Sequence, residues 1–201
     1  MSLALVQSRA LLGLRAPPVT VEVHLANGLP SFTLVGLAEV EVKEARERVR
    51  CALQNSGLEF PNNKRITVNL APADLPKDSG RFDLPIALGI LAASGQIPLE
   101  ALHGWEFAGE LSLSGALRPV RGGLVSSLHG GDQRLVEVRV GHHAGPLLPG
   151  HHCGTGHIAN PRALGVAADV DQQRLPGLPP VAGQFRRHVA SIALCRAHLH
   201  A

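Results

Sequence analysis

Residues 65–94 constrain the fold of this chain more than any other stretch, because strand, loop and helix patterns follow one another directly. The segment Arg65–Leu70 is predicted to form a buried strand. Residues 84–93 are apolar on nearly every side, which predicts a central buried helix, and Gly89 predicts close approach of a neighbouring backbone. Asp83, directly before this run, is the predicted N-cap of the helix.

The residues before this unit favour further sheet packed around it. Residues 3–14 are mostly apolar and predict either a strand pair or a strand followed by a turn. Residues 19–25 alternate β-branched with polar side chains, and residues 32–35 form a second short strand pattern. Asn27-Gly28 between them is a tight-turn signal, so we expect the two runs to form a hairpin.

Two more segments complete the elements predicted before residue 128. From Glu39 to about Asn55, apolar residues recur at helical spacing while oppositely charged residues stand four apart on the other faces. This pattern predicts an amphipathic helix with a solvated charged side. Residues 105–111 predict a strand, and residues 113–117 predict a turn with the start of a return strand.

The composition changes near residue 128. All three lysines precede residue 78, whereas nine of the eleven histidines follow residue 128. Residues 129–201 are rich in Gly, Pro and His and contain one strand-like run, Leu135–Val140. Such a composition rarely buries enough apolar surface to offset the entropy of ordering. We therefore predict one domain at residues 1–128 and an atypical tail at residues 129–201 that is disordered or irregular.

Composition also bears on the cellular setting. No apolar run is long enough for a membrane span, and the first residues lack the pattern of a signal peptide. Three widely spaced cysteines disfavour a secreted disulfide framework, so the expected location is cytoplasmic, with no membrane partner. The formal net charge of +3 arises entirely after residue 128, which weakens the case for a nucleic-acid-binding domain.

Three segments, in order, closely resemble the N-terminal domain of the magnesium-chelatase-like AAA+ proteins, the ComM/YifB family. They are VTVEVHLANGLPSFTLVGLAEVEVKEARERVR, RITVNLAPADLPKDSGRFDLPIALGILAAS and FAGELSLSGALRPVRG. The resemblance covers residues 1 to about 128 and implies a Lon-like, ribosomal S5 domain 2-like fold. The expected fold class is therefore α/β, an α+β sandwich with a mixed sheet, helices on one face and a poorly structured C-terminal tail.

The resemblance also implies a role within a larger machine. In this family the domain precedes an AAA+ ATPase module, and members are implicated as hexameric helicases that aid branch migration, a DNA recombination step, during natural transformation. We expect this chain to be the non-catalytic N-terminal domain of such a protein, here a fragment lacking the ATPase module. The expected partners are the AAA+ module or subunits of the same family, and DNA through the assembled ring. ATP and Mg are expected only for the missing module, so this chain needs no cofactor.

Two other functions are kept as alternatives. One is a stand-alone protein-interaction module with a metal-prone, His-rich tail, and the other is a residual Lon-like peptidase. The tail has an explanation of its own: an out-of-frame reading of a GC-rich gene would give Arg-, Gly-, Pro- and His-rich text without lysine.

No catalytic residue is predicted for this chain. It contains no GxxxxGK[ST] loop, so we expect no nucleotide hydrolysis by that route. Lon-type sites use a serine activated by a lysine, but here Arg81, Phe82 and Asp83 stand near the nucleophile position and no lysine follows Lys77. Ser79 and Lys77 are too close in sequence, and in the wrong order, to replace that pair easily.

The remaining candidates concern interfaces and metals. Six charged loop residues are candidates for contact with a neighbouring subunit, the AAA+ module or DNA: Asp74, Lys77, Asp78, Arg81, Arg118 and Arg121. For the first four we favour local charge pairing, and for the last two arginines a solvated loop. Four tail residues are weak candidates for metal ligands: His151, His152, Cys153 and His157. Structural zinc sites usually combine ligand pairs at turn spacing with several cysteines, so no evolved metal site is expected.

Overall fold

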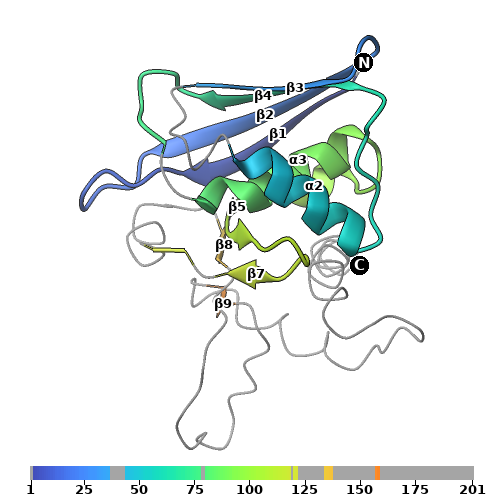
Figure 1. The fold of residues 1–201 in the computed structure, drawn as a ribbon. Coiled ribbons are helices and arrows are strands. Elements are labelled where there is room, and N and C mark those ends of the chain that lie inside the picture. Colours follow the sequence, from blue (N-terminus) through green and yellow to red (C-terminus); the bar gives the residue numbers. More distant parts are fainter. Residues whose placement is uncertain are drawn as a thin grey trace, which may run out of the picture.

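The computed structural model describes residues 2–36, 44–77, 80–118 and 120–121, together with two short strands at 134–137 and 157–158 (Figure 1). Two layers make up this part of the chain, a mixed sheet and a pair of helices that cover one of its faces. The predicted fold class, a mixed sheet with helices on one face, is confirmed. No helix among these residues is long and apolar enough to cross a membrane.

The large sheet has the order β3-β4-β2-β1-β5-β8-β9. Pairing is antiparallel for β1–β2, β2–β4 and β8–β9, and parallel for β3–β4, β1–β5 and β5–β8. The strands span β1 Ser2–Arg9, β2 Pro18–Ala26, β3 Ser31–Val35, β4 Arg65–Ala71, β5 Trp105–Ala108, β8 Arg134–Glu137 and β9 His157–Ile158.

The predicted hairpin of residues 19–25 with 32–35 is wrong. β4 lies between β2 and β3, antiparallel to the first and parallel to the second. The two long alternating strands, β2 and β4, pair over seven residues and bury one face of each, which outweighs the local turn signal at Asn27-Gly28. A parallel pair also needs a long crossover, and the segment from β3 to β4 supplies it with a helix.

Two helices, α2 (Ala45–Asn55) and α3 (Asp83–Ala93), lie on the same face of the sheet (Figure 1). α3 packs against β1 and β2, and α2 packs against α3, which explains why α3 is buried on almost all sides as predicted. A Cβ atom at Gly89 would lie 2.5 Å from Cγ2 of Val23, so the close neighbour is a side chain and not the backbone that was predicted. The predicted start of the first helix at Glu39 falls outside the described residues.

The predicted strand at residues 105–111 is divided at Gly109. The amide of Gly109 donates to the carbonyl of Arg81 at 2.9 Å, and its own carbonyl accepts from the amide of Leu84 at 3.0 Å. Because these bonds tie the chain to the start of α3, β5 ends at Ala108 and the next strand leaves the large sheet. That strand, β6 (Glu110–Leu111), pairs with β7 (Leu117–Arg118) in a small hairpin, as the turn at residues 113–117 predicted.

The predicted domain boundary near residue 128 lies outside the described residues, as does most of the predicted tail. Within the strand-like run at Leu135–Val140, the structure describes residues 135–137 as part of β8, which pairs in parallel with β5. The division into residues 1–128 and 129–201 therefore stays a prediction.

Candidate functional site

The loop between β4 and α3, where the family resemblance would place a Lon-type site, directs most of its described charges inward. The Lys77 side chain is fully buried, and its ammonium group donates to the carbonyl oxygen of Pro72 within the same loop. Burial lowers the pKa of Lys77, and the nearby carboxylate of Asp74 partly opposes that shift. Lys77 therefore closes the loop on itself.

Arg81 joins this loop to two other segments. Its side chain is 1% exposed, Nη1 donates to the carbonyl of Arg9 at 3.0 Å, and Nη2 donates to the carbonyl of Arg121. A guanidinium group offers five donors in a fixed plane, which suits it to hold separate backbone carbonyls together. Arg81 thus connects the end of β1, the start of α3 and the segment after β7.

Asp83 is fully buried and forms the centre of a second connection. Its carboxylate accepts two bonds from Arg48 of α2, at 2.6 and 3.0 Å, and one from the amide of Leu111 at 3.1 Å. The prediction that Asp83 caps its helix is wrong: Phe82 occupies the N-cap position and makes no side-chain cap bond. Arg48 competes successfully for the carboxylate because a charged, two-point hydrogen bond is stronger than a neutral one.

A third ionic contact links β1 to β5. Arg9 donates to Glu106 through Nε at 2.7 Å and Nη2 at 2.8 Å, and to the carbonyl of Ala16 through Nη1 at 2.7 Å. The two side chains are 10% and 2% exposed. β1 and β5 share only the Gln7–Glu106 register position, so this pair holds the two strands together where their ladder is short.

The interface candidates fall into two groups. Asp74, Arg118 and Arg121 are exposed, and Arg118 pairs with Glu110 at 3.0 Å. Lys77 and Arg81 are buried within the chain, which agrees with the local pairing that was the other expectation for them. The physical reason is that both cations satisfy buried carbonyl oxygens. Asp78 and Ser79 lie outside the described residues.

The candidate metal ligands His151, His152 and Cys153 also lie outside the described residues, and of His157 only its place in β9 is described. Within the part of the chain that the structure describes, no group of three or more His, Cys, Asp or Glu side chains is arranged to hold a metal ion.

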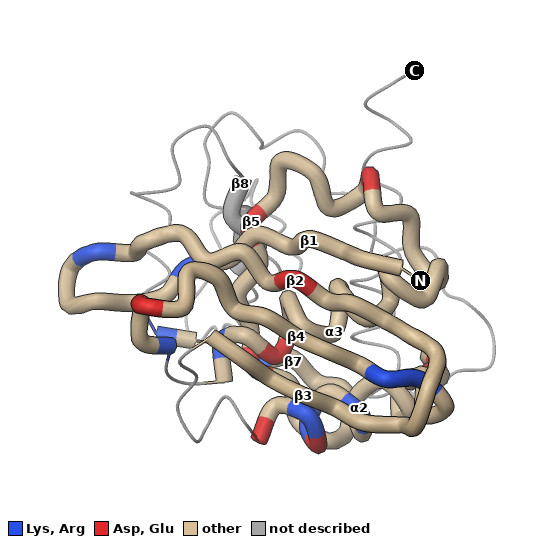
Figure 2. Tube along the Cα trace, turned by 90° about the horizontal axis from the view of Figure 1, so that it is seen from above, with Lys and Arg blue, Asp and Glu red and all other residues tan. Residues whose placement is uncertain are grey.

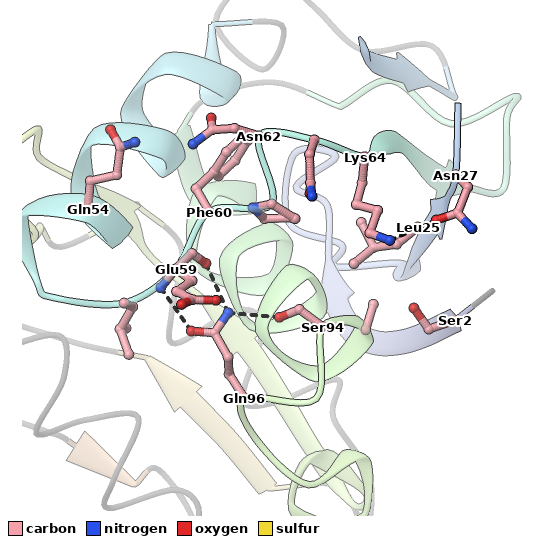
Figure 3. Close-up of a pocket in the computed structure, with 14 residues that line it drawn as sticks. Ser2, Leu25, Asn27, Gln54, Glu59, Phe60, Asn62, Lys64, Ser94 and Gln96 are labelled. Atoms are coloured by element: carbon pink, nitrogen blue, oxygen red, sulfur yellow. Dashed lines mark hydrogen bonds between the residues drawn. The ribbon is translucent and has the colours of Figure 1, made fainter. Parts of the chain in front are cut away.

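A groove of about 770 Å³ lies at the other end of α3 (Figure 3). Gln96 forms part of its wall and binds the backbone of Glu59 at two points, accepting from the amide and donating to the carbonyl, both at 2.9 Å. Lys64 donates to Asn27 at 2.7 Å. Half of the lining residues carry amide or hydroxyl side chains, and the two charged ones are Glu59 and Lys64.

Sequence reasoning missed Arg9, Arg48 and Glu106, the residues that pair across elements. One signal was present: Glu106 stands within the apolar run Trp105–Ala108, and Arg9 ends an apolar strand. A charged residue inside an apolar run is seldom fully buried without a partner. The sequence alone does not say which partner, because Arg9 and Glu106 lie 97 residues apart.

The buried ion pair around Asp83 predicts a pH dependence of stability. Burial raises the pKa of Asp83 from its ordinary value of 3.8 to about 6, although Arg48 lowers it. The folded state then binds this proton more tightly than the unfolded chain, so this contribution to stability is complete below pH 3.8 and is lost as the pH rises through 6. The loss is about 3 kcal/mol at most.

The measurement compares urea unfolding of the wild type and Asp83→Asn between pH 3.5 and 7. The difference in unfolding free energy between the two should change across this window, whereas exposed Asp74→Asn should track the wild type. Parallel curves for the wild type and Asp83→Asn would contradict the assignment.

Comparisons with known proteins show what this chain is similar to. Residues 21–142 match the family of the ChlI subunit of Mg-chelatase. The protein YifB of Salmonella typhimurium is 61% identical over 127 residues, which cover 63% of this chain and 25% of that protein. The competence protein ComM of Haemophilus influenzae is 64% identical over 122 residues, covering 61% and 24%. A Mycobacterium tuberculosis protein is 41% identical over 128 residues, covering 64% and 25%. The chain thus spans about a quarter of the length of these curated relatives.

Proposed function

Because the chain belongs to the family of the ChlI subunit of Mg-chelatase, we propose that it is the non-catalytic N-terminal domain of a magnesium-chelatase-like AAA+ ATPase. In this proposal the domain supports assembly and partner engagement by an ATP-driven, helicase-type motor in the cytoplasm. ATP and Mg bind to the motor module, and this domain binds neither. DNA is engaged by the assembled ring.

The observation that carries the proposal is that the charged side chains of the loop between β4 and α3 bind groups inside the domain. Lys77, Arg81 and Asp83 each hold a backbone carbonyl, an amide or a partner side chain inside the domain. A Lon-type site needs a lysine amine free to take a proton from a serine. Here the amine of Lys77 is buried against Pro72, so the loop acts as a structural connection and leaves its exposed neighbours for contacts with partners.

A chimera tests this proposal. Residues 1–128 of this chain replace the matching segment of full-length Haemophilus influenzae ComM, and the oligomeric state and ATP hydrolysis of the chimera are measured. We expect both to match those of the unaltered relative. Within the chimera, combined Asp74→Arg, Arg118→Glu and Arg121→Glu substitutions at exposed positions should lower assembly about tenfold, because they reverse the charges offered to the partner.

The matched control is Arg46→Glu, an exposed reversal on α2 that lies on neither loop. It should leave assembly unchanged. A folded chimera that neither assembles nor hydrolyses ATP would contradict the domain assignment. Equal assembly of the triple variant and the control would contradict the loop interface alone.

A further inference from the structure

Strand β3 forms one end of the large sheet, and its outer edge has no strand partner among the residues that the structure describes. Figure 2 shows β3 beyond β4, β2 and β1 at this side of the sheet. Its inner edge pairs in parallel with β4, from Ser31 opposite Arg65 to Val35 opposite Asn69. The outer edge of such a strand is a template for one more strand.

The hydrogen-bond phase of β3 shows which backbone groups face outward. The amide of Ser31 donates to the carbonyl of Lys64 at 3.4 Å, so the backbone groups of Ser31 face β4. Because successive residues of a strand direct their N–H and C=O groups to opposite sides, Thr33 and Val35 also face β4. Phe32 and Leu34 therefore face outward and offer two donors and two acceptors.

The side chains of β3 carry no charge that would protect an edge strand. No charged residue occurs from Asn27 to Gly36, although lysine and other charges commonly guard such edges. Phe32 and Leu34 pack against the core but stay partly exposed, while Ser31, Thr33 and Val35 are exposed on the open face of the sheet. Another strand alongside β3 would complete the burial of the two core-facing side chains.

We propose that β3 pairs antiparallel with β3 of a second copy of this chain, about a two-fold axis at Thr33. Thr33 then lies opposite Thr33 of the second copy, and Phe32 lies opposite Leu34 of the second copy, and the reverse. The outward groups of Phe32 and Leu34 exchange four backbone hydrogen bonds, as hydrogen-bonded pairs of an antiparallel ladder do. The contact is closed and self-complementary, and it joins two sheets into one.

The charges beside β3 favour this antiparallel register with a second copy. Residues that lie side by side on neighbouring strands form a row across the sheet. In this register Ser31 opposes Val35 of the second copy. The row of Ser31 and Arg65 therefore continues into the row of Val35, Asn69 and Glu22 of the second copy. Rows of opposite sign therefore meet in both directions. A parallel pairing of the same two edges would turn the open faces of the two sheets to opposite sides, so these rows could not continue across the contact.

The test measures the self-association of the full chain by sedimentation velocity over a concentration series. The wild type should form a dimer, and Thr33→Lys should raise the dimer dissociation constant at least about fivefold, because two ammonium groups meet at the axis. Thr67→Lys is the matched control: Thr67 lies beside Thr33 on β4, one strand further from the axis, and its substitution should leave the dimer intact.

Two further readouts separate this contact from other modes of association. Combining the Thr33→Lys and Thr33→Glu variants should restore dimers, each with one chain of either variant. Hydrogen exchange should slow at the amides of Phe32 and Leu34 as the concentration rises, while the amides of Thr33 and Val35 stay protected by β4 throughout. A wild type that stays monomeric at several hundred micromolar overturns the proposal. So does a dimer that Thr33→Lys leaves unchanged, or one formed only after an extended peptide is added.

Discussion

Replacing Glu106 by alanine is expected to lower the free energy of unfolding by about 3–5 kcal/mol, because it leaves the buried guanidinium of Arg9 without its carboxylate. Arg9 keeps only its bond to the carbonyl of Ala16. The loss should fall on the junction of β1 with β5, which share a single register position. Urea unfolding followed by the fluorescence of Trp105, the only tryptophan and the immediate neighbour of Glu106, measures it.

The control for this prediction is Glu110→Ala, which breaks a pair of the same chemistry at the surface. The side chains of Arg118 and Glu110 are 60% and 32% exposed, so this change should cost about 1 kcal/mol or less. The double variant Arg9→Met with Glu106→Leu should recover most of the loss, because it removes both buried charges together. If Glu106→Ala and Glu110→Ala lowered the free energy of unfolding equally, the buried Arg9–Glu106 pair would stabilise the fold no more than a surface pair does.

Replacing Gly36 by alanine is expected to cost about 3 kcal/mol or more, from two separate causes. Gly36 has φ = 103°, a conformation that residues with a side chain rarely adopt. An added Cβ atom would also lie 2.2 Å from the carbonyl oxygen of Leu70, which belongs to the backbone of β4 and cannot move away alone. Strain and overpacking each cost about 1–3 kcal/mol.

Gly104→Ala separates the two causes. Gly104 also has positive φ, at 77°, but an added Cβ atom there would meet nothing within 4 Å. This control should cost about 1–2 kcal/mol from the backbone conformation alone. Thermal or urea unfolding of both variants gives the difference, and a Gly36→Ala loss no larger than that of Gly104→Ala would contradict the close approach of β3 and β4.

Local patterns predicted most of the elements. The strand-like run at residues 65–70 and the apolar run at residues 84–93 indicated β4 and α3, because short runs bounded by turn residues reflect the burial of the element. The expectation of a buried strand holds for one face of β4. The pairing of strands did not follow in the same way. The insertion of β4 between β2 and β3 depends on which long strands bury most surface together, and Asn27-Gly28 reports only the local turn.

The sequence by itself determined the strand–loop–helix unit at residues 65–94 and, through its resemblance, the family. Only the tertiary structure decided what the charges of that unit do. Asp83 was predicted to cap its helix but pairs with Arg48. Lys77 and Arg81 were candidates for an interface or for local pairing, and both hold carbonyl oxygens inside the domain. The physical reason is that a buried charge takes its partner from whatever the fold brings near. That partner can lie 35 residues away, as Arg48 does from Asp83, or 97, as Arg9 does from Glu106.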